Sequence, residues 1–335
     1  MYIPNKKIED AKDITDTPLV ERRIESTKKY SQSLFDVPIW NGTMDSAIDW
    51  MVHCAKINKS TKVGFVNANN LNIAYKNTAL KIHYRSCDRV FADGMGVNLA
   101  SKIAWPKDQA IKSNINGTDL FPILCDALER EGQGIYLLGA SKGVARRVAV
   151  NLNQTNPDLK VCGYHDGYLN DELTNHRLIK DINRSGASVL LVAMGTPIQE
   201  TWLDENGSQL RIPVKISVGG LFDFYSNRVP RAPQWFRNLG SEWIWRLAME
   251  PKRMWKRYLL GNPLFMLRVG KEALSKSFTR SSRILNFNIS FSRFVNEMLK
   301  IVLGIIASTT GLIMLSPVLI IIAFCIVFES NGGPL

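Results

Sequence analysis

Residues Ser188–Glu200 have the sequence SVLLVAMGTPIQE, the stretch on which the prediction of the fold depends. The mostly apolar run Ser188–Ala193 predicts a buried strand. Gly195 and Pro197 follow and predict a turn into a helix, because proline is favoured in the first helical turn. The stretch therefore predicts one strand and the start of the helix that covers it.

The same unit recurs along the chain. Further apolar runs predict five more strands, at Val63–Val66, Arg89–Ala92, Gly134–Leu138, Leu159–Gly163 and Val214–Val218. Helical periodicity follows several of them, at Leu71–His83, Asp119–Arg130, Gly143–Gln154 and Asp171–Arg184. Strands that alternate with helices at this spacing predict an α/β fold, with a parallel sheet covered by helices on both faces.

The residues directly after the predicted strands are polar or glycine. In parallel sheets, ligands bind beyond the carboxyl ends of the strands. Residues at these positions are Asn67, Asn69, Asp93, Gly94, Gly139, Gly195, Gln199, Glu200, Gly219 and Gly220. The asparagines, Gln199 and Glu200 offer partners for sugar hydroxyls, a uracil edge or an anion, but such residues suit turns and helix caps equally well.

Asp93 is the most informative carboxylate in the chain. It follows the Arg89–Ala92 strand directly, and Gly94 and Gly96 leave room for a ligand beside the backbone. A partly buried carboxylate there can accept a proton from a sugar hydroxyl, as a general base in glycosyl transfer must. Aspartate is also a common N-cap, here of a helix that begins near Met95, so spacing alone leaves both roles open.

The net charge of +12 is concentrated in one segment. Residues 228–293 contain ten Arg and four Lys against three Glu, and so hold eleven of the twelve net positive charges. A basic segment of this kind favours phosphate on lipid, nucleotide or nucleic acid. The four tryptophans among these charges predict an amphipathic helix at a membrane interface: Trp235, Trp243, Trp245 and Trp255. A core-packed helix with a solvated basic face fits the same pattern.

Met298–Phe328 predicts a membrane segment. It is a 31-residue stretch with Lys300 as its only charge, which is long enough to cross a hydrocarbon layer of ~30 Å. Pro317 lies near its middle, so a kinked span and a re-entrant hairpin are both open. Basic residues precede the stretch, which places the globular part in the cytoplasm. The N-terminus is polar, and we expect no signal peptide.

Several classes of protein lose support from the sequence. The five cysteines are far apart and form no C-x-x-C pair, which argues against a disulfide framework or a structural zinc. The four histidines lack metal-ligand spacing, and no D-x-D pattern is present to hold a metal against a nucleotide diphosphate. Neither a Walker A sequence nor a G-x-G-x-x-G after a strand occurs. We therefore expect neither a metal nor a cofactor.

Six motifs occur in order along residues 35–265. They are Val66–Asn69, Ala92–Gly96, Asn116–Leu120, Gly163–Tyr168, Gly195–Glu200, and the segment from Arg231 through Glu242-Trp243 to Arg246-Leu247. Together they closely resemble the WecG/TagA/CpsF glycosyltransferases. The resemblance implies an inverting, metal-independent transfer of a hexose or N-acetylhexosamine-type sugar from a UDP-sugar to a polyprenyl-diphosphate-linked acceptor. Such enzymes build capsule, exopolysaccharide or teichoic acid linkage units in bacteria.

The resemblance also assigns roles to residues. Asp93 stands where the family has its proposed catalytic base, Asn67 where it has its active-site Asn, and Gln199 where it has its conserved Gln. Arg231–Arg257 corresponds to an Arg-rich appendage that closes over the active site, helps at the membrane and would stabilise the departing UDP. Other expected binding residues are Asn69, Gly94, Thr118, Asp119, Gly139, Gly195, Glu200, Arg231 and Arg246.

A second resemblance concerns the C-terminal end. Arg293-Phe294, the apolar stretch and Glu329–Pro334 look like the opening membrane segment of bacterial polyprenyl-phosphate hexose-1-phosphate transferases, a re-entrant helix hairpin in that family. Asn296 stands where that family usually has an acidic residue, and its catalytic Asp-Glu pair lies beyond the hairpin. We expect the segment to act only as an anchor, in a natural truncated fusion or in a fragment of a bifunctional protein.

These observations divide the chain into six parts. They are a polar leader (1–34), a Rossmann-like α/β glycosyltransferase core (35–228), a helical Arg- and Trp-rich appendage (229–270), a basic linker (271–297), a membrane helix or re-entrant hairpin (298–328) and the truncated start of a sugar transferase domain (329–335). We expect the protein at the cytoplasmic face of the bacterial inner membrane. A homo-oligomer would cover the apolar appendage away from the membrane.

Two other classes of protein fit part of the sequence. A non-catalytic scaffold of a polysaccharide assembly complex would need the membrane stretch but not Asn67, Asp93 or Gln199. A nucleic-acid-binding protein would present the 228–293 basic segment in an exposed groove. The adjoining membrane stretch and the polar strand ends argue against nucleic acid as a partner.

Overall fold

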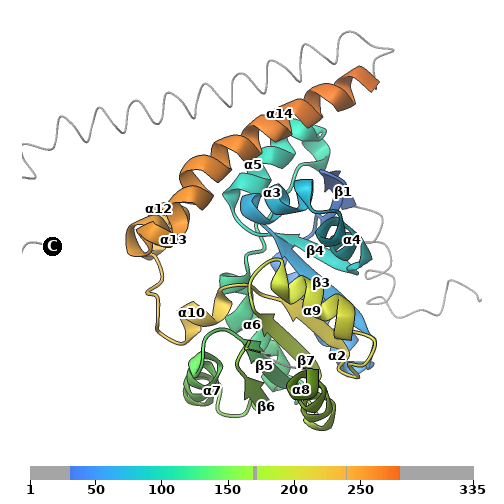
Figure 1. Ribbon diagram of the computed structural model, residues 1–335, viewed down its shortest axis with the longest axis vertical. Helices are drawn as coiled ribbons and strands as arrows, with labels where there is room; N and C mark the ends of the chain where they lie inside the picture. The colour runs from blue at the N-terminus through green and yellow to red at the C-terminus, as the bar shows by residue number, and fades with distance from the viewer. Residues whose placement is uncertain (1–30, 169–171, 239, 280–335) are drawn as a thin grey trace, which may run out of the picture. The chain divides into compact units, whose positions relative to one another are not determined.

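A sheet of six parallel strands organises the protein in the computed structural model, which describes residues 31–168, 172–238 and 240–279 (Figure 1). Its strand order is β4-β3-β8-β7-β5-β6. The strands are β3 (Thr61–Val66), β4 (Arg89–Ala92), β5 (Gly134–Gly139), β6 (Lys160–His165), β7 (Val189–Ala193) and β8 (Val214–Ser217). The predicted α/β fold and all six predicted strands are confirmed, each strand within about two residues of its predicted ends.

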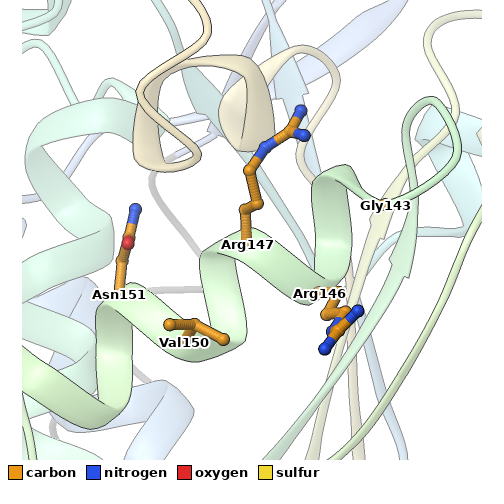
Figure 2. Close-up of a pocket in the computed structure, with 5 residues that line it drawn as sticks. All are labelled: Gly143, Arg146, Arg147, Val150 and Asn151. Atoms are coloured by element: carbon orange, nitrogen blue, oxygen red, sulfur yellow. The ribbon is translucent and has the colours of Figure 1, made fainter.

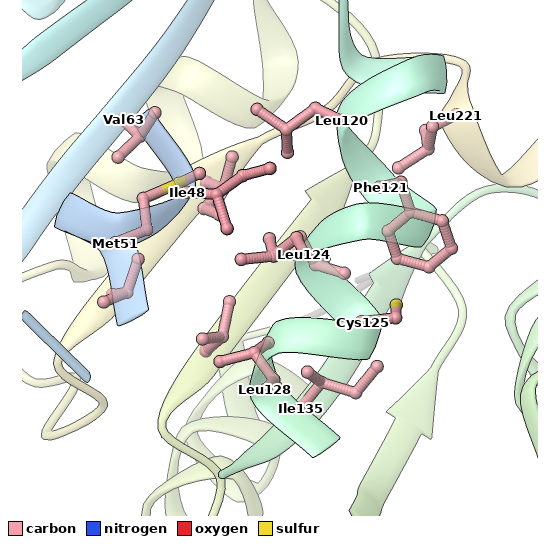
Figure 3. Packing of buried hydrophobic residues seen from close by; sticks show 14 of the residues in the cluster. Ile48, Met51, Val63, Leu120, Phe121, Leu124, Cys125, Leu128, Ile135 and Leu221 are labelled. Atoms are coloured by element: carbon pink, nitrogen blue, oxygen red, sulfur yellow. The ribbon is translucent and has the colours of Figure 1, made fainter. Parts of the chain in front are cut away.

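Side chains along the strands alternate between two apolar layers, because successive residues of a strand point to opposite faces. Ile135 and Leu137 of β5 pack into a cluster with α2 (Met44–Lys56), α6 (Gly117–Arg130), α7 (Val144–Thr155) and α10 (Leu221–Tyr225). Tyr136 and Leu138 pack with α8 (Glu172–Arg184) and α9 (Ile198–Asn206) on the other face. Figure 3 shows part of the first layer, where Leu124 of α6 lies among the core side chains.

An antiparallel hairpin of β1 (Ser31–Leu34) and β2 (Val37–Trp40) precedes the sheet. Its first strand occupies residues that the sequence analysis assigned to the polar leader, so ordered structure begins before the predicted boundary at residue 35. Phe35 and Asp36 form the turn, with φ of 54° and 62°. Two positive φ angles are typical of the two-residue turns that match the twist of a hairpin.

The predicted helix Leu71–His83 is in fact two helices, α3 (Ala68–Lys76) and α4 (Thr78–Ser86). Asn77 separates them with φ of −110° and ψ of 103°, outside the helical region. Its side chain accepts a hydrogen bond from the backbone N–H of Leu80 and so caps α4. The break also changes the phase of the buried positions, from Leu71 and Ala74 in α3 to Leu80 and Tyr84 in α4.

The predicted appendage is helical. It comprises α11 (Gln234–Asn238), α12 (Glu242–Met249), α13 (Pro251–Trp255), a π-helical turn (Lys256–Leu260) and α14 (Gly261–Thr279). The two remaining elements are α5 (Met95–Ala104) and a short 3-10 turn (Lys107–Gln109). The chain divides into two units at Arg268, and of the second unit, Val269–Leu335, the structure describes only the end of α14.

No helix within the described ranges is long and apolar enough to cross a membrane. The predicted membrane segment 298–328 lies outside the described residues, as do residues 1–30 of the leader, most of the basic linker and the start of the second transferase domain at 329–335.

Arg89 of β4 is buried between two tryptophans. Its guanidinium carbon lies 4.5 Å from the ring of Trp40 and 4.3 Å from the ring of Trp50. Burial lowers the pKa of Arg89 to about 10, against the raising effect of Cys54 and Asp88. The stacked arginine links the hairpin and α2 to β4, the strand that Asp93 directly follows.

Replacing Arg89 should therefore destabilise the fold. We expect Arg89→Ala to lower the free energy of unfolding by about 2–4 kcal/mol, since desolvated cation–π contacts and core volume are both lost. Urea unfolding measures this effect, with Arg177→Ala, an exposed arginine on α8, as the matched control. Equal unfolding midpoints for the two variants would contradict the stacking role.

Candidate active site

Asp93 and Asn67 lie together at the carboxyl ends of neighbouring strands. Val66 of β3 is in register with Ala92 of β4, so the residues that follow them are adjacent. The backbone N–H of Asp93 donates to the carbonyl of Val66 at 2.8 Å. Nδ2 of Asn67 donates to Oδ2 of Asp93 at 3.4 Å. The structure thus brings together the predicted base and the predicted active-site asparagine.

Asn67 is oriented by the helix that it starts. As the N-cap of α3, its Oδ1 accepts the backbone N–H groups of Asn69 and Asn70, both at 3.1 Å. An amide has one acceptor end and one donor end, so fixing Oδ1 on the helix turns Nδ2 toward Asp93. Asn69, a predicted binding residue, contributes its backbone N–H to this cap.

The surroundings of Asp93 suit a base. Burial raises the pKa of its carboxyl group above the ordinary value for aspartate. The hydrogen bond from Asn67 and the charges of Arg257 and Arg246 lower it, while the charge of Asp119 raises it further. A carboxylate with a raised pKa is a stronger base, and a general base works best when its pKa approaches the working pH.

Gly94 holds the turn after Asp93 in a conformation that favours glycine. Its φ is 96°, and its backbone N–H donates to Oδ1 of Asn114 at 2.8 Å. The neighbouring N–H of Ile115 donates to the carbonyl of Ala92 at 3.0 Å. Asn114 therefore fixes the peptide after Asp93. Asn114 was not among the predicted site residues, and it lies just before the Asn116–Leu120 motif.

Asp119, at the start of α6, forms ion pairs with two arginines from the segment after β8. Arg231 pairs with Oδ1 of Asp119, and Nη1 of Arg237 lies 3.3 Å from the same oxygen. Burial acts to raise the pKa of Asp119, but hydrogen bonds from Asn116 and Arg231 and the charges of both arginines outweigh it, so the pKa is lowered. Asp119 is therefore ionised and ties the start of the appendage to α6.

Arg246 of α12 and Arg257 of the π-helical turn face the same carboxylates. Arg246 stacks on the ring of Phe224 at 4.8 Å, and a Cβ at Gly220 would lie 3.5 Å from its Nη2. Burial lowers the pKa of Arg257, the nearby Tyr258 raises it, and the charge of Arg246 lowers it again. The two cations thus lie close enough to repel each other.

Four arginines share one feature. The Nε atoms of Arg231, Arg237, Arg246 and Arg257 are buried and have no hydrogen-bond partner. A buried N–H donor without a partner is unfavourable. The arrangement is therefore one that an anion with several oxygen atoms would stabilise.

Glu242, the first residue of α12, is a further carboxylate at the site. Burial raises its pKa, with the charge of Arg231 lowering it and those of Asp93 and Asp119 raising it. Glu242 belongs to the last of the six sequence motifs, but no role was predicted for it. Its place beside Asp93 follows from the fold of the appendage, which no local pattern shows.

Gln199 and Glu200 lie beneath the edge of the sheet, with exposed fractions of 2% and 1%. Oε1 of Gln199 accepts the backbone N–H groups of Gly195 at 3.2 Å and Gly219 at 3.0 Å. Its Nε2 donates to Oε1 of Glu200 at 2.8 Å, which also accepts from Thr196 at 2.9 Å. Gln199 therefore joins the loops after β7 and β8, and contact of either side chain with substrate stays a prediction.

The other predicted binding residues occupy different parts of the edge. The carbonyl of Thr118 accepts a 2.6 Å hydrogen bond from Tyr225, which fixes the residue before Asp119. Gly139 is the last residue of β5, four places from β4 in the sheet, and a Cβ there would lie 2.5 Å from the backbone of Ala193. Gly139 is thus required by strand packing and lies apart from the Asp93 cluster.

A separate pocket lies on α7, lined by Gly143, Arg146, Arg147, Val150 and Asn151. Figure 2 shows that Arg146 and Arg147 extend in different directions from the helix. None of the predicted site residues lines this pocket, which distinguishes it from the cluster around Asp93.

Within the described residues, no group of three or more His, Cys, Asp or Glu side chains is arranged to hold a metal ion. The four cysteines in this part of the chain are free thiols, and Cys54 and Cys125 are buried.

Asp93, Asn67 and the buried arginines thus gather at the carboxyl ends of the parallel strands, the edge at which enzymes with such sheets bind their ligands. The chain belongs to the glycosyl transferase WecG/TagA/CpsF family, whose sequence profile matches residues 32–279. The protein is therefore a glycosyltransferase. The match confirms the first resemblance and extends it to β1 and α14.

Two relatives carry the name N-acetylglucosaminyldiphosphoundecaprenol N-acetyl-beta-D-mannosaminyltransferase. One, from Bacillus subtilis, is 30% identical over 247 residues, which cover 73% of this chain and 93% of the relative. The other, from Bacillus spizizenii, is 31% identical over 186 residues, covering 56% of this chain and 70% of the relative.

Proposed function

We propose that the protein transfers a hexose or N-acetylhexosamine from a UDP-sugar to a polyprenyl-diphosphate-linked acceptor, with inversion at the anomeric carbon. The observation that carries this proposal is the cluster in which Asp93, oriented by Asn67, faces Arg246 and Arg257. A base and a cationic site for a leaving diphosphate are the two groups that such a transfer requires.

Asp93 acts on the acceptor. Its carboxylate takes the proton from a sugar hydroxyl as that oxygen attacks the anomeric carbon of the donor. The bond between the anomeric carbon and the phosphate oxygen breaks, and its electrons leave with UDP. Attack opposite the leaving group inverts the configuration. Asn67 keeps the carboxylate in place, because its amide is itself fixed as the cap of α3.

The arginines act on the donor. Negative charge grows on the diphosphate as UDP departs, and cations already in place stabilise that charge without reorganising. Arg246 and Arg257 are the arginines whose charges act on Asp93, and Arg231 is paired with Asp119. The buried Nε atoms of all three have no hydrogen-bond partner in the protein, and diphosphate oxygens would provide one.

The names of the relatives narrow the substrates to test first. Their acceptor carries N-acetylglucosamine on undecaprenyl diphosphate, and the sugar transferred is N-acetylmannosamine. We infer an acceptor of the same type for this chain. An N-acetylhexosamine donor follows from the same comparison, the arginine cluster supports a diphosphate as its leaving group, and uridine on that diphosphate rests on the family resemblance.

The appendage presents an apolar surface that suits a membrane-bound acceptor. Large apolar side chains are exposed along it, among them Trp235, Trp243, Ile244, Met249, Trp255, Leu259, Leu260, Leu264 and Leu267. Exposed lysines at positions 252 and 256 lie between them in sequence. Apolar side chains mixed with cations bind anionic lipid interfaces. We propose that this surface contacts the membrane, at its cytoplasmic face.

The leucine pair at Leu259 and Leu260 tests the membrane contact. Replacing both with serine should raise KM at least about tenfold for an acceptor held in lipid vesicles, since each buried leucine contributes roughly 1.5–3 kcal/mol and a tenfold change needs only about 1.4 kcal/mol. KM for a short-chain acceptor in solution should stay unchanged. Leu173→Ser on α8, which is as exposed as Leu260 at 59%, is the control. Equal KM changes for both acceptors would contradict the proposal.

The segment 298–328, predicted as an anchor, would hold the enzyme at the same membrane. Its likeness to the opening segment of polyprenyl-phosphate hexose-1-phosphate transferases stays a proposal, as do a longer bifunctional protein and a homo-oligomer that covers the apolar surface away from lipid.

A donor panel tests the proposed reaction. The protein is incubated with UDP-sugars and a polyprenyl-diphosphate-N-acetylglucosamine acceptor, with and without EDTA, and UDP release is measured. We expect release with one donor, dependent on the acceptor and resistant to EDTA, because the arginines supply the positive charge. Acceptor-dependent release that EDTA abolishes would contradict the arginine mechanism. Failure of every tested UDP-sugar to release UDP would contradict the transfer.

A further inference from the structure

Helix α3 contacts the candidate base near its N-terminus and the appendage further along. Its N-cap Asn67 donates to Asp93, as described above. One turn further along the helix, Asn72 contacts the appendage at two places. Nδ2 of Asn72 donates to the carbonyl of Gly261 at 2.7 Å. Nη1 of Arg268 donates to the backbone carbonyl of Asn72 at 3.0 Å and to its Oδ1 at 2.8 Å.

An aromatic cluster surrounds these hydrogen bonds. The guanidinium of Arg268 lies 4.4 Å from the ring centre of Tyr75, which also belongs to α3. Phe35, in the turn of the hairpin, meets Tyr75 edge-on at 5.2 Å and Phe265 at 5.8 Å. Phe265 is 1% exposed. The hairpin turn, α3 and α14, which are far apart in sequence, therefore meet here. Arg268 stacks on Tyr75 and donates hydrogen bonds to Asn72 at this point.

These contacts lie next to the arginines of the site. Gly261 is the first residue of α14, four residues after Arg257. The bond from Asn72 to Gly261 thus fixes the chain directly after the π-helical turn that carries Arg257. On the other side of that turn, Arg253 reaches Asp223 of α10 at 3.6 Å. Arg257 is held between the ion pair of Arg253 with the buried Asp223 and the partly buried contacts of Asn72.

We propose that Arg268, Asn72 and Tyr75 form a clamp that sets the position of Arg246 and Arg257 relative to Asp93. Because α3 also carries Asn67, one helix would place both the base and the leaving-group site. Arg268 and Asn72 are positioning residues in this proposal, which rests on the proposed function, and neither touches substrate. A charge-assisted pair of hydrogen bonds and a stacked ring make the clamp directional as well as strong.

The test compares Arg268→Ala with Lys271→Ala in the full chain. Lys271 is an exposed residue of the same helix, so both variants lose one positive charge there. Backbone hydrogen exchange over residues 242–260 should become faster in Arg268→Ala and stay unchanged in Lys271→Ala. Donor KM should rise and kcat/KM should fall roughly tenfold, since small misplacements of binding groups weaken catalysis. Asn72→Ala should act in the same direction.

The pH dependence distinguishes positioning from simple destabilisation. Asp93 is faced by Arg246 and Glu242 from α12, by Arg257 from the π-helical turn and by Asp119 from α6. When the arginines move away, they lower the pKa of Asp93 less, so this pKa rises. Glu242 moves away with them, but the loss of one negative charge does not offset the loss of two positive charges. The acid limb of kcat/KM should therefore move to higher pH in Arg268→Ala.

Arg268→Lys separates the parts of the clamp. It keeps a cation over Tyr75, so its exchange should be slower than that of Arg268→Ala. Wild-type exchange and a wild-type acid limb in Arg268→Ala would overturn the clamp, as would equal changes in Lys271→Ala. If the wild-type chain transfers no sugar, the proposed function fails, and hydrogen exchange alone still decides whether the clamp exists.

Discussion

Asp93→Asn should lower kcat by about 10²–10⁴-fold, the contribution of a general base, while UDP binds at least as tightly as to the wild type. The amide cannot take the proton of the acceptor hydroxyl. The substitution also removes a negative charge beside Arg246 and Arg257, so the cationic site for the diphosphate is kept. UDP release measures kcat, and calorimetry measures UDP binding.

The pH profile and a matched control complete this test. Wild-type kcat/KM should fall as pH decreases through the pKa of Asp93, which burial raises above the ordinary value, because the protonated carboxyl cannot act as a base. Asp108→Asn, an exposed aspartate in the 3-10 turn, should keep full activity. Full activity in Asp93→Asn would remove this residue from the mechanism, and lost UDP binding would make it a binding residue instead.

The double variant Arg246→Ala with Arg257→Ala should lower kcat/KM by about 10²–10³-fold, the range for removing groups that stabilise developing charge. The two cations lie close together, and the charge of Arg246 lowers the pKa of Arg257. A diphosphate between them would relieve that repulsion and occupy their free Nε donors. Removing them should weaken UDP much more than uridine, because only UDP carries the phosphates.

Calorimetry with UDP and with uridine tests this expectation directly. The Arg177→Ala variant, with an exposed arginine removed from α8, should bind both ligands as the wild type does. A double variant with wild-type affinity for UDP would contradict the leaving-group role of the arginines. Equal losses for UDP and uridine would indicate a general collapse of the site.

The sheet was predictable because five of its six strands, all but β6, are buried on both faces. Runs such as Val189–Ala193 are apolar without interruption, and the polar residues after them mark where each strand ends. The break between α3 and α4 was not predicted, because apolar residues continue on both sides of Asn77, whose backbone leaves the helical region. The hairpin escaped prediction because its turn, Phe35-Asp36, lacks the usual Asn-Gly signal.

The candidate site was predictable where a residue follows a strand directly. Asp93 and Asn67 stand at neighbouring strand ends, so the parallel sheet alone brings them together. Asn114 reaches the site through a loop and Glu242 through the fold of the appendage. No sequence spacing predicts where either segment runs. Gln199 follows a strand too, yet it bonds Gly195 and Gly219 within the protein. A position after a strand therefore does not decide whether a side chain faces the ligand.

The most direct test of the central claim is to look for the lipid-linked product itself. Wild type and Asp93→Asn are incubated with the active UDP-sugar and polyprenyl-diphosphate-N-acetylglucosamine, and the lipid is examined by mass spectrometry and its new linkage by NMR. We expect wild type to add one sugar with the anomeric configuration inverted from that of the donor, and Asp93→Asn to add almost none. A product with retained configuration, or equal product from both proteins, would contradict the account.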